Sequence, residues 1–555
     1  MPRSTVVRRS AVATRSAVAT RSAVAAALVL SAVSPSARAD STLSLSGTVE
    51  ASGLDHVLVE FEVPEGTQEI EIAHDDLSDA DVLDWGLYDT VGFRGWGGGN
   101  AEPIVVGALA ASRSYLTGPM EPGTWSVVIG KAVIDGPSAS YELVIQLRDA
   151  PTLAPQDERV PYVPSAPLSS ELRWYAGDLH VHSRESGDAR PSIDEIVAFA
   201  RAQGLDFVEL SDHNTTSQLD YIVDAQERSS DVLILPGVEW TSYAGHANGI
   251  GATSFVDHKI GQPGVTIEAV AEAFRAQSAL VSINHPNFAL GSLCIGCSWE
   301  HALEAEAVDA VEIVTAGTSQ IFGNQAIAFW DALCDTGRHV APVGGSDDHR
   351  AGVEVSAPNT PIGTPTTMVL AGELSHAGIV DGIRSGRTVV KVLGPSSPMV
   401  ELDADRALEG DTVKAASVEL SAKLSGARGM QAVWVKNGVP EEPIDVAADE
   451  VVLRRAVSAP VSGEDRYRVE VHADGARATV TSHLWVETGP PGAGPESTAL
   501  VGGGGCVLGR GRGEGTTLAY ATLGFAALAL ATLALRRRPR SDEKADREAS
   551  GAKRR

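Results

Sequence analysis

The sequence predicts an α/β domain, built on a parallel sheet or barrel, between two β-sandwich domains. Residues 40–150 alternate apolar and polar positions in runs such as "QEIEIAHD", with turn residues between the runs and no helical segment. Residues 171–396 alternate strand-like runs with helical segments, which is typical of a parallel α/β sheet. Residues 397–488 return to strand-like runs such as "ASVELSAKL", which indicates an Ig-like sandwich.

The chain begins with a segment typical of secretion. Residues 1–39 start Arg-rich, continue through the apolar run "AVAAALVLSAV" and end in the "SARA" of "SARAD". A basic segment, a short apolar segment and an Ala-x-Ala site form a signal peptide, so we expect cleavage between Ala39 and Asp40. An amphipathic or disordered tail is the alternative interpretation.

Between the first sandwich and the α/β domain, residues 151–170 are Pro-rich and are expected to form a linker. The first helical segment of the α/β domain is "SIDEIVAFARAQG". Its Ser192 and Glu195 match a capping box, and Ile193, Ile196 and Val197 form one apolar face. Two further helices are predicted in "TIEAVAEAFRAQ" and "GNQAIAFWDALCDTG".

The end of the chain predicts a membrane anchor. Residues 489–515 form a Gly-rich linker that contains Cys506, residues 516–535 carry no charge, and residues 536–555 form a basic tail expected to be cytoplasmic. This end resembles the MYXO-CTERM class of sorting tails of bacterial surface proteins. The resemblance implies removal of the tail and lipid attachment at Cys506, whereas a permanent transmembrane anchor is the alternative. Either way, we expect the protein at the cell envelope or surface.

Composition excludes some classes of protein. The net charge of −28 argues against nucleic acid as a partner, because phosphate backbones require a basic surface. Four cysteines in 555 residues do not form a disulfide scaffold. Cys294 and Cys297 suggest a small disulfide loop, a staple in a lid or an extra metal site, and Cys334 is expected to be a buried thiol.

Residues able to bind metals recur at the ends of the apolar runs in the α/β domain. In a barrel or an open parallel sheet, the carboxyl ends of the strands meet where active sites form. Like charges and unpaired imidazoles crowded together are unfavourable unless a cation compensates them. His, Asp and Glu without Cys suit Zn²⁺, Mn²⁺ or Fe²⁺. The predicted ligands are His180, His182, Asp188, His213, Glu239, His246, His285, Asp347 and His349.

The motifs "DLHVHS", "SDHN", "GVEW", "GHANGIG", "INHP" and "GGSDDH" resemble, in this order, the PHP (polymerase and histidinol phosphatase) superfamily. The resemblance implies a distorted seven-stranded β/α barrel with two or three divalent metal ions. The flanking sandwiches resemble the CehA/McbA-type branch of secreted PHP hydrolases. The fold class expected is therefore α/β, a distorted (β/α)7 PHP barrel flanked by two β-sandwich domains.

The resemblance also implies how the predicted ligands are shared among the metals. One ion would be held by His180, His182, Glu239 and Asp347, and a second by Asp188, His213 and His349. A third would be held by His246 and His285, with Glu239 bridging to the first. Asp188 stands where some members of the family have His, so the second site is richer in oxygen. The catalytic residues implied are Glu239, Asp347 and His349.

The expected activity is metal-dependent hydrolysis of a small-molecule phosphate ester by a metal-activated water. Arg184, Arg190 and Arg350 lie in loops from which they could bind substrate oxygens, although a solvated loop charge is the favoured interpretation of each. Two alternatives remain open: hydrolysis of a carboxylic ester or carbamate, and a surface binding protein that keeps metal without turnover. We favour an enzyme, because a binding scaffold need not keep all the predicted ligands.

Overall fold

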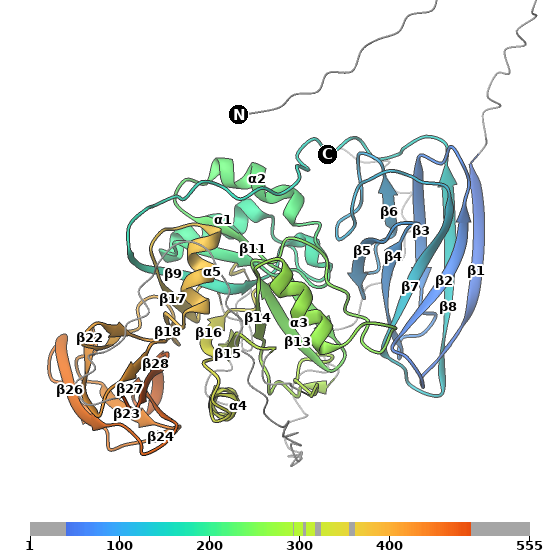
Figure 1. Cartoon of the computed structure of the whole chain (residues 1–555). Coiled ribbons are helices and arrows are strands. Elements are labelled where there is room, and N and C mark those ends of the chain that lie inside the picture. The colour runs from blue at the N-terminus through green and yellow to red at the C-terminus, as the bar shows by residue number, and fades with distance from the viewer. Residues whose placement is uncertain (1–39, 292–293, 303–306, 317–322, 354–360, 490–555) are drawn as a thin grey trace, which may run out of the picture.

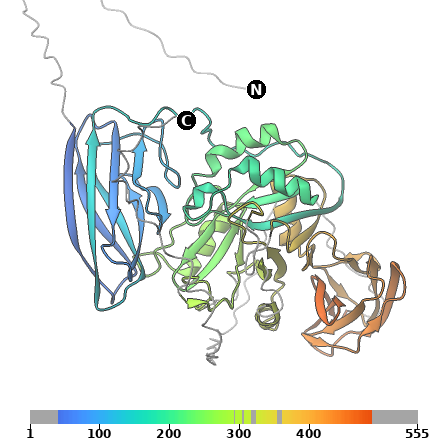
Figure 2. The same cartoon turned by 180° about the vertical axis from the view of Figure 1, so that it is seen from behind.

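The structure is a computed structural model that describes residues 40–489, apart from 292–293, 303–306, 317–322 and 354–360. It contains a central domain with a β-rich domain on either side (Figures 1 and 2). The predicted signal peptide, most of the Gly-rich linker with Cys506, the predicted membrane span and the basic tail lie outside the described residues. No helix among the described residues is long and apolar enough to span a membrane.

The N-terminal domain is a sandwich of two antiparallel sheets, as its alternating sequence predicts. Ile70 and Ile72 lie in the core between the sheets, together with Trp125, Leu143 and Ile145. One sheet has the order β1-β8-β3-β6, with bounds Ser41–Glu50, Ser138–Arg148, Glu69–Asp75 and Ile104–Gly107. The other has the order β2-β7-β4-β5, with bounds His56–Val63, Gly123–Val133, Val82–Tyr88 and Phe93–Gly98.

The central domain contains two groups of mixed strands. In the first, the order is β11-β10-β9-β17-β18, with bounds Leu233–Pro236, Phe207–Leu210, Arg173–Val181, Thr366–Ala371 and Thr388–Lys391. In the second, the order is β12-β13-β14-β15-β16, with bounds Glu239–Ser242, Gly245–Ile250, Leu280–Ile283, Ala310–Thr315 and Ala341–Gly345. Strands β9, β10 and β11 are parallel to one another, as are β14, β15 and β16.

Helices lie between many of these strands. They are η1 (Arg184–Ser186), α1 (Ile193–Gln203), α2 (Leu219–Arg228), α3 (Ile267–Ala276), α4 (Gly323–Cys334) and α5 (His376–Arg384). Helix α1 begins at the predicted capping box, in which the Ser192 side chain accepts from the Glu195 amide and the Glu195 side chain accepts from the Ser192 amide. This reciprocal pairing satisfies amide groups that the first turn of a helix leaves free.

Two isolated parallel bridges join the two groups of strands. Val181 at the end of β9 pairs with Asp348, which follows β16, and His213 after β10 pairs with Glu239 at the start of β12. In the described residues these strands do not form one continuous ring of ladders. Strands β12, β13 and β14 are antiparallel neighbours, with α3 between β13 and β14 in the sequence. The α/β character is as expected. The closed seven-stranded barrel remains part of the proposal below.

The C-terminal domain is also sandwich-like, but one of its sheets continues a sheet of the central domain. Strand β28 pairs with β18, so the central strands extend into β28-β27-β23-β24, with β21, β25 and β29 beside them. The opposite sheet has the order β20-β19-β22-β26, with bounds Ala407–Leu408, Met399–Ala404, Ser417–Ser425 and Glu450–Ser458. The remaining strands have these bounds: β21 Thr412–Lys414, β23 Gln431–Lys436, β24 Val439–Pro440, β25 Ile444–Asp445, β27 Glu464–Ala473, β28 Ala476–Thr481 and β29 Leu484–Glu487.

Candidate metal centre

All nine predicted ligands lie in one cluster at the ends of the central strands. His180 is the second-to-last residue of β9, and His182 follows that strand directly. His213, His285 and Asp347 follow β10, β14 and β16. The other predicted ligands lie at the start of β12, within β13, and in the loops after β9 and β16: Glu239, His246, Asp188 and His349.

Glu239 is the centre of the cluster. Its side chain is fully buried, and a buried carboxylate is unfavourable unless cations or donors surround it. Asn284 donates to Oε1 of Glu239 at 2.9 Å. Five imidazole nitrogens approach the two oxygens, at 2.8 Å for His213, 3.3 Å for His180, His246 and His285, and 3.5 Å for His182.

Asp347 lies on one side of this carboxylate. Its Oδ1 is 3.1 Å from Nε2 of His182 and 3.4 Å from Nε2 of His180, and the ligand atoms of these three residues lie within 4.8 Å of one another. Asp347 has a φ of 55°, in the left-handed region that a residue with a side chain rarely adopts. Strained backbone of this kind is found at functional sites, where the surrounding structure holds a side chain in position.

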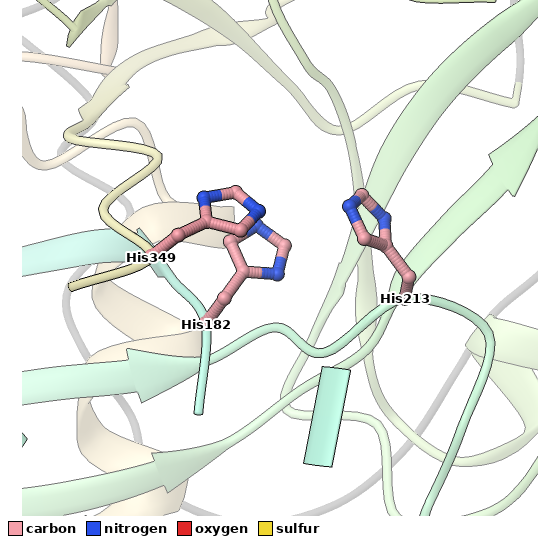
Figure 3. Close-up of side chains that lie close together, drawn as sticks. All are labelled: His182, His213 and His349. Carbon is pink, nitrogen blue, oxygen red and sulfur yellow. The ribbon is translucent and has the colours of Figure 1, made fainter. Parts of the chain in front are cut away.

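A second group lies towards solvent. Oδ2 of Asp188 is 3.5 Å from Nε2 of His213 and 3.4 Å from Nε2 of His349, and 56% of the Asp188 side chain is exposed. His182 and His349 stack with their ring centres 4.0 Å apart, and His213 lies opposite them (Figure 3). The ligand atoms of these three histidines also lie within 4.8 Å of one another, so His182 stands between the first and second groups.

The histidines differ in their charge. Burial alone would lower the pKa of His180 and of His213, but nearby carboxylates, Glu239 foremost, raise the pKa of both well above its ordinary value. Burial and the charge of His349 instead lower the pKa of His182 to about 3. The carboxylates thus favour the protonated form of His180 and His213, whereas burial beside His349 favours the neutral form of His182.

The residues fit a bound cation. Both ring nitrogens of His246 and Nε2 of His180 are buried and make no hydrogen bond in the part of the chain that the structure describes. Buried nitrogens without hydrogen bonds are unfavourable, and a divalent ion would satisfy them. The set of imidazole and carboxylate donors suits Zn²⁺, Mn²⁺ or Fe²⁺.

Sequence reasoning missed the residues that orient these ligands. Glu312, in β15, accepts from the backbone amide of His285 at 2.9 Å, and its Oε1 lies 3.1 Å from Nδ1 of His180. A partner on the second ring nitrogen fixes the orientation of a metal-binding imidazole. The signal was a single acidic residue in the apolar run "AVEIVTAG", and Glu312 is indeed buried.

The cysteines follow the first of the predicted alternatives. Cys294 and Cys297 form a disulfide, so the sulfur of Cys297 is not available as a metal ligand beside His246 and His285. The backbone carbonyl of Cys297 instead lies 3.0 Å from Nδ1 of His285 and can orient that ring. Cys334 is a buried free thiol, as predicted.

Two of the three candidate arginines share a groove. Arg190 and Arg350 line a hollow of about 540 Å³, whose apolar wall includes Phe199 of α1. The amide of Arg190 donates to the carbonyl of His349 at 3.3 Å, which places the start of this groove beside the cluster. Arg184 does not line the groove, and its guanidinium lies over the ring of Tyr221 at 5.5 Å.

No protein-family model and no curated protein matches the chain. Among solved structures, a two-domain protein from Bacteroides vulgatus that contains a predicted PHP-like metal-dependent phosphoesterase is similar over 60% of this chain and 100% of that chain, at 16% identity and a TM-score of 0.33. The mitogen of Yersinia pseudotuberculosis is similar over 21% of this chain and 98% of that chain, at 17% identity and a TM-score of 0.13. At these TM-scores the similarities decide neither fold nor activity.

Proposed function

We propose that this protein is a metal-dependent phosphoesterase of the PHP type, with the strands of its central domain arranged as a distorted barrel. The observation that carries the proposal is the buried carboxylate of Glu239 within 3.5 Å of five imidazole nitrogens. The order of the sequence motifs supports the PHP superfamily, and the flanking sandwiches support its CehA/McbA-type branch.

Two or three divalent ions would be held by the nine predicted ligands. When bound, such ions supply an activated water and neutralise charge that develops on the ester oxygens. The residues of the chain prepare this site: Glu312 and the carbonyl of Cys297 orient His180 and His285, and the exposed Asp188 leaves one side open to substrate. Arg190 and Arg350 would hold anionic oxygens of the substrate in the groove.

The test is a panel of nitrophenyl phosphate, bis-nitrophenyl phosphate, nitrophenyl acetate and an aryl carbamate, each assayed with added Mn²⁺ or Zn²⁺. Phosphoesterase activity predicts turnover of one or both phosphates and little turnover of the acetate and carbamate. Preference for the acetate or carbamate would instead support the alternative hydrolase. Elemental analysis of the 40–489 fragment should give two or three ions per chain, and one or none would refute the cluster.

We also propose that the protein is exported and held at the membrane through its C-terminal end. The support is the sequence of residues 1–39 and 490–555 alone. Mature protein should begin at Asp40 and fractionate with membranes. Cys506→Ala separates the two interpretations of the tail, because a processed and lipidated tail requires the thiol and a plain transmembrane anchor does not. Full-length protein in the cytosol would contradict both.

A further inference from the structure

The N-terminal sandwich lies beside the central domain (Figures 1 and 2), and its hydrogen bonds reach the loops that carry candidate metal ligands. The amide of Ser114 donates to Oε2 of Glu185 at 3.0 Å, and its hydroxyl donates to the Glu185 carbonyl at 2.7 Å. Thr215 donates its hydroxyl to the Ser114 carbonyl at 2.9 Å. Glu185 lies three residues before Asp188, and Thr215 two residues after His213. The sandwich is therefore docked at the open side of the centre.

Two glycines allow the domains to approach closely. A Cβ on Gly187, whose φ is 76°, would lie 2.6 Å from the carbonyl oxygen of Gly97 in the sandwich. A Cβ on Gly130 of β7 would collide with the hydroxyl of Tyr243 and lie 3.2 Å from Cβ of Asp84. The missing side chain at Gly130 thus leaves the space in which Tyr243 of the central domain reaches Asp84 of the sandwich.

Asp84 lies in β4 and is the acidic residue that this contact fixes. Tyr243 donates its hydroxyl to Oδ2 of Asp84 at 2.7 Å. Tyr243 belongs to the turn between β12 and β13, the strands that carry Glu239 and His246. This hydrogen bond engages Oδ2 and not Oδ1 of Asp84, so Oδ1 could contact another group. The residue is half-buried rather than fully enclosed.

Asp84 also lies within electrostatic range of the second group of ligands. Burial raises the pKa of Asp84 to about 6, while the hydrogen bond from Tyr243 opposes the rise and the charges of His213 and Asp188 act in opposite directions. A carboxyl group with such a pKa holds a proton in part of its population near neutral pH. That is the condition a proton donor requires.

The other carboxyl groups around the centre are engaged or enclosed. Three belong to the predicted ligand set, and Glu312 serves two of the ligands as described above. Asp178 and Asp212 accept from backbone amides within the loops of the centre. Glu209 is fully buried beneath it. Of these described groups, Asp84 combines partial exposure with an oxygen left open by its fixed hydrogen bond.

We propose that Asp84, held by Tyr243, donates a proton to the leaving oxygen of the ester, so that the N-terminal sandwich completes the active site. The inference rests on the proposed hydrolysis. As the oxygen of the attacking water bonds to phosphorus, the bond from phosphorus to the leaving oxygen breaks, and the proton on Asp84 passes to that oxygen. The proton that the attacking water gives up passes to solvent, and the Asp84 carboxylate regains a proton from solvent. Product leaves as the protonated alcohol or phenol.

Asp84→Asn tests this through the leaving group. A poor leaving group needs the proton and a good one does not, so kcat/KM should fall at least ~100-fold for phenyl phosphate and less than ~5-fold for nitrophenyl phosphate. Asp81→Asn is the matched control: Asp81 precedes the same strand, but its Oδ1 accepts from the Asp135 amide at 2.8 Å. Tyr243→Phe should give a smaller loss with the same dependence on leaving group. Equal losses on both esters would refute the inference.

A second readout does not depend on turnover. Sulfate, which does not titrate between about pH 5 and pH 7, should bind the wild-type metal-loaded protein less tightly as pH rises and Asp84 loses its proton. In calorimetric titrations, the sulfate affinity of Asp84→Asn should lack the part of the pH dependence that comes from Asp84. The titratable groups around Asp84 are common to both proteins, so their contributions cancel in the comparison; they are Tyr243, Tyr115, His56, His213 and Asp188.

Coincident sulfate curves would overturn the placement of Asp84. If the curves differ but the wild-type protein hydrolyses none of the esters, the proposed function fails and the placement of Asp84 stands.

Discussion

Replacing Glu239 with Gln removes the negative charge on which the candidate metal centre converges. The fully buried carboxylate has five imidazole nitrogens within 3.5 Å, and the amide would turn one acceptor into a donor facing those rings. Loss of a partner that only orients a ligand weakens metal binding about 10- to 100-fold, so loss of a central ligand should weaken it at least ~100-fold.

This weakening has a measurable thermodynamic equivalent. Bound metal stabilises the folded state by RT ln(1 + [L]/Kd), so a 100-fold rise in Kd removes about 2.7 kcal/mol of that stabilisation at a fixed, saturating metal concentration. Thermal unfolding with and without Zn²⁺ or Mn²⁺ measures the difference. Elemental analysis after dialysis should show fewer ions per chain in Glu239→Gln than in the wild type.

Glu209→Gln is the matched control for this experiment. Glu209 is as buried as Glu239, but neither of its oxygens has a hydrogen-bond partner among the described residues. Burial raises its pKa well above its ordinary value. Burial therefore favours the neutral form of Glu209, which the isosteric amide reproduces. Metal content and stability should stay within about 1 kcal/mol of the wild type. Equal metal content and equal stabilisation in Glu239→Gln would show that the carboxylate is not a ligand.

Three further predictions test other parts of the molecule. Asp347→Asn should lower metal content and leave less than about a tenth of the wild-type rate, a loss of more than roughly 1.4 kcal/mol in transition-state stabilisation; a larger residual rate with metals bound would contradict the role of Asp347. The double variant Arg190→Gln, Arg350→Gln should raise KM for phosphate esters about 10-fold, whereas Arg184→Gln, outside the groove, should not, and equal effects would rule the groove out. Burial raises the pKa of Glu409 in the C-terminal domain to about 8, with the Leu402 amide opposing the rise. Because the folded-state pKa is raised, its contribution to stability is full below about pH 4 and is lost as pH rises towards 8; Glu409→Gln should therefore lose less thermal stability between pH 5 and 8 than the wild type, and parallel curves would contradict this.

The local structure and the candidate ligands could be predicted from the sequence because the residues that determine them are close together in the chain. Alternation of apolar and polar residues determines which face of a strand is buried, and this gave the two sandwiches. The capping box of Ser192 and Glu195 places the start of α1 at the predicted residue. The spacing of Cys294 and Cys297 allows a disulfide within one loop. The nine candidate ligands could be listed because each is a metal-binding residue type in or shortly after an apolar run of the α/β domain.

Other features depend on contacts between distant segments, which no local pattern encodes. Pairing of β28 with β18 joins the C-terminal sandwich to the central sheet, although the sequence between them indicates separate domains. His182 proves to lie between two ligand groups, because its distance to His349 depends on how β9 and the loop after β16 meet.

The sequence by itself determined which residues could bind a metal, since donor type and position at strand ends are local properties. Only the tertiary structure decided what surrounds them. In the sequence Glu312 is one acidic residue in an apolar strand. Its contacts with His285 and His180 form only because β15 lies beside β14. In the sequence Asp84 is an ordinary strand residue, and its hydrogen bond with Tyr243 forms only when the sandwich docks on the central domain. Burial and neighbouring charges set the pKa of such side chains. Both arise only when segments far apart in the chain pack together and exclude water.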